Sequence, residues 1–145
     1  MGMGYGANYA DVIEIQSIKK ICPKEFQAFF NIIDEAKVSL DSVAEFLDKD
    51  SELDLSHIKE DDEAVRLQDV IISTWKKLTR AFHKKTDLIL YIGFHNSGEE
   101  GDRYDEVSGP YFSVGGLYQL SPAGKKLLKT VGKRNISRKF FVTFG

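Results

Sequence analysis

The sequence predicts an α+β fold in which N-terminal helices pack on one face of a small, mostly antiparallel sheet built from the C-terminal half. Apolar residues recur at steps of three and four between residues 23 and 86, as on amphipathic helices. After Asp87 the pattern changes to continuous apolar runs and alternation with period two. Helices and strands that are segregated along a chain are typical of α+β architecture.

One domain over residues 1–145 is expected, because 145 residues is an ordinary length for a single compact unit. Gly2, Gly4 and Gly6 predict a flexible lead-in over residues 1–9. Residues 11–16 alternate with period two and predict a short edge strand, although a helix that includes Ile18 and Ile21 fits the pattern nearly as well.

Three features predict the helices of the first half. Pro23 suits the first position of a helix whose apolar stripe runs on to Ala36. Ser39 or Asp41 is expected to cap a second helix. A third, longer helix is predicted to be capped by Ser56 or Asp61 and to end near residue 85, because carboxylates occupy residues 60–63 and lysines the last turn, as the helix dipole favours.

The second half predicts three strands and one helix. Residues 88–94 are apolar at nearly every position, which predicts a central strand covered on both faces. Residues 111–120 alternate as a second strand, with Gly115 and Gly116 indicating a bulge or a close approach. A helix is expected from Ser121 to Gly132, and residues 136–144 predict the last strand.

Composition removes several classes of protein. Cys22 is the single cysteine, so an internal disulfide and a cysteine-ligated zinc site are excluded. No apolar run is long enough to span a membrane, and no secretory signal pattern opens the chain, so a cytoplasmic location without membrane association is expected. No phosphate-binding glycine motif and no metal-ligand spacing is present, so neither a cofactor nor a metal is predicted.

Charge is distributed unevenly along the chain. Residues 34–63 carry twelve carboxylates and three lysines, a net charge of −9, whereas residues 120–145 carry seven basic residues and no acidic one. Two interpretations follow: the two segments pack together and neutralise each other, or they leave a polarised surface that selects a partner.

The most function-like segment is the loop at 96–110, which is long for a connection in a compact domain and rich in charge. Its charged and aromatic residues are candidates for binding a partner. They are Glu99, Glu100, Asp102, Arg103, Tyr104, Asp105 and Glu106. Because the spacing fails the calcium-loop pattern, we predict binding of a basic partner here rather than of a metal ion.

Catalysis has little support in the sequence. His95, at the end of a predicted strand, is the one histidine that we select as a catalytic candidate, because imidazole titrates near neutral pH. No activated-nucleophile motif accompanies it, and Cys22 is expected to be a buried, inert thiol.

The basic C-terminal segment at 125–139 supports an alternative function. Its cations would contact phosphates, as in nucleic-acid-binding proteins. They are Lys125, Lys126, Lys129, Lys133, Arg134, Arg138 and Lys139. The acidic balance of the whole chain argues against this alternative. We therefore expect a non-catalytic, cytosolic protein-interaction module whose acidic surface, from residues 34–63 and 96–110, docks on a basic partner, with nucleic-acid binding and a small enzyme centred on His95 as alternatives.

Overall fold

The computed structural model describes residues 5–96, 105–116, 122–131 and 135–144, and it confirms the α+β fold. Four strands form one antiparallel sheet in the order β2-β3-β1-β4. The strands are β1 (Tyr5–Ile13), β2 (Ile89–His95), β3 (Gly109–Gly115) and β4 (Ile136–Phe144). The helices are α1 (Ile15–Ile21), α2 (Pro23–Ala36), α3 (Leu40–Lys49), α4 (Asp61–Thr86) and α5 (Pro122–Val131).

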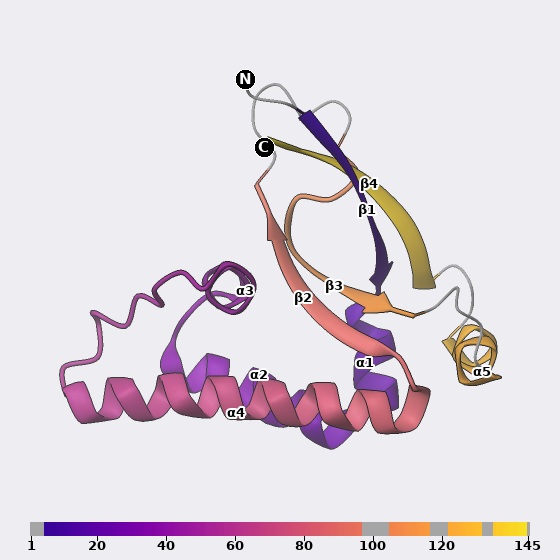
Figure 1. The fold of residues 1–145 in the computed structure, drawn as a ribbon. Coiled ribbons are helices and arrows are strands. Elements are labelled where there is room, and N and C mark those ends of the chain that lie inside the picture. The colour runs from indigo at the N-terminus through magenta and orange to yellow at the C-terminus, as the bar shows by residue number, and fades with distance from the viewer. Residues whose placement is uncertain (1–4, 97–104, 117–121, 132–134, 145) are drawn as a thin grey trace.

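Helices cover one face of the sheet, and the core lies between them (Figure 1). α4 packs against both α2 and β2, while α3 lies against β2 and β3. Phe29 of α2, Leu78 of α4 and Phe112 of β3 are among the side chains that fill this layer. None of the helices within the described ranges is long and apolar enough to cross a membrane.

The N-terminal strand differs from the prediction in extent and position. β1 begins at Tyr5, so residues 5–9 belong to the sheet and not to a flexible lead-in. β1 also lies inside the sheet, where it pairs with β4 along its whole length, from Tyr5–Phe144 to Ile13–Ile136. The sheet is therefore not built from the C-terminal half alone. Glu14 then separates β1 from α1. Of residues 11–16, for which the pattern allowed either a strand or a helix, the first three belong to β1 and the last two to α1.

The helices of the first half follow their sequence signals closely. Pro23 occupies the first turn of α2, and the buried apolar stripe ends at Ala36 as predicted. Ser39 caps α3: its hydroxyl oxygen accepts a hydrogen bond from the backbone N–H of Ser42 at 3.2 Å. α4 carries its carboxylates in the first turn and its basic residues in the last.

β2 corrects the prediction of a strand that is covered on both faces. It is an edge strand, and its side chains alternate between the core and the opposite face. Leu90 and Ile92 are buried against the helices, while Tyr91 remains 49% exposed on the other side. The run is apolar at nearly every position because the open face of the sheet also carries apolar side chains, Ile89 and Tyr91, which are exposed there.

Replacing Ser39 with Ala should lower the free energy of unfolding by about 1 kcal/mol, because the first turn of α3 loses its side-chain cap. Urea denaturation measures the loss. Ser42→Ala is the control: it removes the hydroxyl oxygen that accepts a hydrogen bond from Ser39, and it keeps the Ser42 backbone N–H that donates to the Ser39 hydroxyl. It should cost less, and equal losses in both variants would show that the hydrogen bond from the backbone N–H does not stabilise α3.

Candidate functional site

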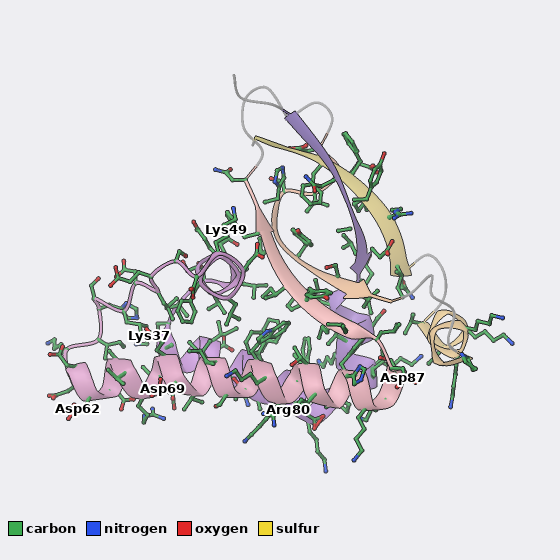
Figure 2. The ribbon with its side chains drawn as sticks, viewed as in Figure 1. Lys37, Lys49, Asp62, Asp69, Arg80 and Asp87 are labelled. Carbon is green, nitrogen blue, oxygen red and sulfur yellow. The ribbon has the colours of Figure 1, made fainter. Side chains whose placement is uncertain are left out.

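The acidic surface consists of the twelve carboxylates between residues 34 and 63, which lie at the end of α2, on α3, in the following loop and at the start of α4. Eleven of these side chains are exposed, and Glu63 is half-buried. Only three lysines share the segment, so its net charge is −9 and little positive charge within it compensates the carboxylates. Lys37 and Asp62, which belong to this region, are labelled in Figure 2.

Arg66 is the one residue that pairs with two carboxylates of the acidic surface within the described parts of the chain. Its guanidinium lies 3.0 Å from the Glu35 carboxylate, and it also contacts Glu63 one helical turn before it. Hydrogen bonding to Arg66 lowers the pKa of Glu63 below its usual value. Arg66 thereby joins α2 to α4 and fixes the geometry of the region, while most of the negative charge stays unpaired.

The loop between α3 and α4 is shaped by its own side chains. The Asp54 carboxylate accepts a hydrogen bond from the Ser56 backbone N–H at 3.0 Å, which lowers the pKa of Asp54. His57 Nε2 lies 2.6 Å from the Ala36 carbonyl oxygen and ties the loop to the end of α2. Leu53 and Leu55 anchor the loop in the core.

A groove of about 490 Å³ runs between this loop and the first turns of α4. Leu53, Leu55, Ile58 and Ala64 contribute apolar surface to it, and Val65 is 61% exposed beside it. Asp61 and Lys59 also line the groove, so its apolar residues lie beside one charge of each sign, within the acidic segment at 34–63. We call it the loop–helix groove.

α4 keeps the two charged segments apart. The acidic surface lies at the N-terminal end of α4, while α5 packs beside α4 near its opposite end (Figure 1). Figure 2 marks the two ends of α4 with the labels Asp62 and Asp87. A helix of 26 residues spans about 39 Å, several Debye lengths at physiological salt. The interpretation in which the segments pack together and neutralise each other is therefore not supported.

Seven exposed lysines of the described residues gather around the other end of α4. The amine of Lys85 donates a hydrogen bond to the Ile21 carbonyl oxygen at 2.8 Å, which fastens α1 to the end of α4. α5 supplies further cations beside them. The lysines are Lys19 and Lys20 of α1, Lys84 and Lys85 of α4, and Lys125, Lys126 and Lys129 of α5.

The basic segment proposed for nucleic-acid binding is not brought onto one surface. Arg138 and Lys139 are neighbours on β4 and point to opposite faces of the sheet. Arg138 lies 5.4 Å over the Tyr9 ring and near Asp11, away from the lysines of α5. Lys133 and Arg134 fall outside the described residues.

The loop at 96–110 is described only in part. Glu99, Glu100, Asp102, Arg103 and Tyr104 lie outside the described residues. The Asp105 side chain is only 1% exposed, and its carboxylate lies 2.7 Å from His95 Nε2. Glu106 is exposed, and its carboxylate accepts a hydrogen bond from the Phe140 backbone N–H. Both described carboxylates thus hold the loop against the sheet.

His95, the catalytic candidate, is buried by this arrangement. Its ring packs 4.8 Å from the Phe141 ring, and Asp105 covers one of its ring nitrogens. β2 and β4 are the outer strands of the sheet, so contact between these two rings shows that the sheet curls around its open face. The geometry gives His95 the surroundings of a structural residue.

A second hollow, which the sequence did not indicate, lies on this open face. We call it the sheet cleft; its volume is about 350 Å³. β1 pairs with β3 only at Val12–Ser113 among the described residues, and the cleft lies beyond that pair, where the strands diverge. Its lining includes Asn8, Asp11, Asp48, Tyr91, Tyr111 and Phe141.

Two glycines let tyrosine rings lie flat against the sheet. The Tyr111 ring rests directly on Gly93, its partner on the neighbouring strand. The Tyr91 ring rests on Gly115, 2.8 Å from the place where a Cβ atom would stand. The close approach predicted for Gly115 is therefore made by an aromatic ring. Side chains at these two glycine positions would displace the rings that line the cleft.

Asp48 gives the sheet cleft a negative charge. One of its carboxylate oxygens accepts a hydrogen bond from the Phe94 backbone N–H at the free edge of β2. Burial raises the pKa of the Tyr111 hydroxyl, and the nearby Asp48 charge raises it further. Asp11 also borders the cleft, and its buried Oδ1 has no hydrogen-bond partner within the described residues.

Metal-ligating clusters of three or more His, Cys, Asp or Glu side chains are absent from the parts of the chain that the structure describes. Cys22 is buried, and burial raises the pKa of its thiol, which agrees with the expected inert thiol. Comparison with protein-family models, with curated proteins and with solved structures finds no match for this chain.

Gly93→Ala should lower the free energy of unfolding by about 1–3 kcal/mol, because the new methyl group overlaps the Tyr111 ring. Gly115→Ala should cost less, since the half-exposed Tyr91 ring can move away. Chemical denaturation of both variants, and of Gly93→Ala in a Tyr111→Ala background, measures the overlap. An undiminished loss in that background would contradict the contact.

Asp48→Asn should lower the pKa of Tyr111 toward its ordinary value without reaching it, because burial is the larger cause of the shift. Absorbance of the phenolate as pH rises, with Tyr111→Phe to identify the signal, measures the change. Since the folded-state pKa is raised, Tyr111 contributes stability below its ordinary pKa, and this contribution is lost as pH rises through the folded value. An unchanged Tyr111 titration in Asp48→Asn would show that the Asp48 charge does not raise the pKa of Tyr111.

Proposed function

We propose that this protein is a non-catalytic interaction module that binds a basic protein partner through the acidic surface at residues 34–63. The observation that carries the proposal is the separation of charge along α4, which leaves eleven exposed carboxylates at one end of the molecule. Surfaces with a potential of one sign attract oppositely charged partners and orient them as they approach.

The loop–helix groove supports a specific contact in addition to long-range attraction. Charge at an exposed rim speeds association but adds little affinity, whereas a buried apolar side chain adds more. The groove offers about 490 Å³ lined by Leu53, Ile58 and Val65, with Asp61 beside it. The partner that fits is a segment with an apolar side chain between lysines or arginines.

A fluorescent peptide of eight lysines around a central leucine tests this function by anisotropy at low and physiological salt. We expect binding that weakens with salt. The variant Glu45→Gln, Glu52→Gln, Glu60→Gln, Asp62→Asn should bind about tenfold more weakly, since four exposed ion pairs together contribute roughly 1.4 kcal/mol. Val65→Ser should also weaken binding, because the leucine loses its apolar contact.

The matched control removes four charges from the other end of α4: Lys84→Gln, Lys125→Gln, Lys126→Gln and Lys129→Gln. It should bind the peptide at least as well as the natural chain. A labelled single-stranded oligonucleotide distinguishes the alternative function. Salt-dependent binding of the oligonucleotide that this control abolishes, together with no peptide binding, would overturn the proposal in favour of nucleic-acid binding.

A further inference from the structure

We infer that the sheet cleft binds an arginine side chain of the basic partner. This inference rests on the proposed function, because the arginine belongs to the protein segment that docks on the acidic surface. It adds a second contact point, about 350 Å³ in volume, on the face of the sheet that the helices leave open.

The walls of the cleft match the flat faces of a guanidinium group. The Tyr91 ring lies over Gly115 and the Tyr111 ring lies over Gly93, so both side chains reach across a neighbouring strand. Phe141 adds a third ring, 6.0 Å from Tyr111. Guanidinium stacks on aromatic rings both as a cation and as a planar group, which a lysine ammonium cannot do equally well.

The charge of the cleft matches the same group. The charged residues that line it are Asp11 and Asp48. Asp11 already faces Arg138 across 3.9 Å, so Asp48 supplies the negative charge that a bound cation would meet. One Asp48 oxygen is held by the Phe94 backbone N–H, so the carboxylate is fixed in place at the edge of β2. A carboxylate beside aromatic faces can accept guanidinium N–H donors while the rings contact the plane.

Asp48 also connects the cleft to the acidic surface, since it belongs to residues 34–63 and ends α3 near β2. A partner segment that follows the carboxylates of α3 therefore meets Asp48 at the edge of the cleft, beside Lys49, which lies 5.5 Å over the Phe94 ring. An extended chain advances about 3.3 Å per residue. A partner that contacts both the loop–helix groove and the sheet cleft therefore needs several residues between the two side chains that bind.

Two peptides of equal charge test the inference: the lysine peptide described above and the same peptide with every lysine replaced by arginine. The arginine peptide should bind several-fold more tightly to the natural chain. Tyr91→Leu should remove this preference while binding of the lysine peptide changes little. Asp48→Asn, which also takes one charge from the acidic surface, should weaken binding of the arginine peptide more than binding of the lysine peptide. Tyr91→Phe should keep it, because the aromatic face is retained. Circular dichroism confirms that each variant is folded.

Failure of the inference is distinguishable from failure of the proposed function. Equal affinities of the natural chain for the two peptides would overturn the arginine site while the acidic surface stands. So would a Tyr91→Leu variant that loses as much affinity for the lysine peptide as for the arginine peptide. If neither peptide binds, the proposed function fails. Titration with N-acetyl-arginine amide, followed by NMR at the Gly93 and Gly115 amides, then decides the cleft alone. Shifts at both amides that Tyr91→Leu abolishes support the site, and their absence overturns it.

Discussion

The structure depends on the burial of one face of α4. Leu67, Ile71, Leu78 and Phe82 follow one another along that face, and all four are buried against α2 and the sheet. Burying such side chains stabilises the fold by about 1.5–3 kcal/mol each, before the entropy of ordering the chain is counted. The helix is thereby held straight across the molecule. The length of α4 sets the distance between the negative and the positive end of the molecule. Among the described residues, no ion pair joins a residue of one end to a residue of the other.

Much of the helical half could be predicted from the sequence because its signals are local. Pro23 fixes the start of α2, and Ser39 caps α3 through a residue three positions away. α4 is marked at both ends by charges that favour its dipole. In each case the residues that determine the helix end are close neighbours along the chain, so their spacing in the sequence is enough to predict it.

The sheet and its cleft depend on residues far apart in sequence. β1 is rich in glycine, alanine and asparagine, and it becomes a strand because β4 pairs with it across more than one hundred residues. The place of β2 at an edge follows from the strand order, which its composition does not contain. The sheet cleft exists because Gly93 meets Tyr111 on the neighbouring strand, and such a register is visible only in the folded chain. The contact between His95 and Asp105 likewise joins residues ten positions apart, and it is visible only in the folded chain.

Separated charge has a mechanical consequence for diffusion. A molecule with opposite poles experiences a torque in the field of another charged body, so it rotates during the approach and not only after contact. For a cationic partner, the end that carries Glu52 and Asp62 leads, and the lysines of α5 trail. Such alignment widens the range of starting orientations from which a collision becomes productive. For the partner that we propose, the length of α4 sets the separation of charge on which this alignment depends.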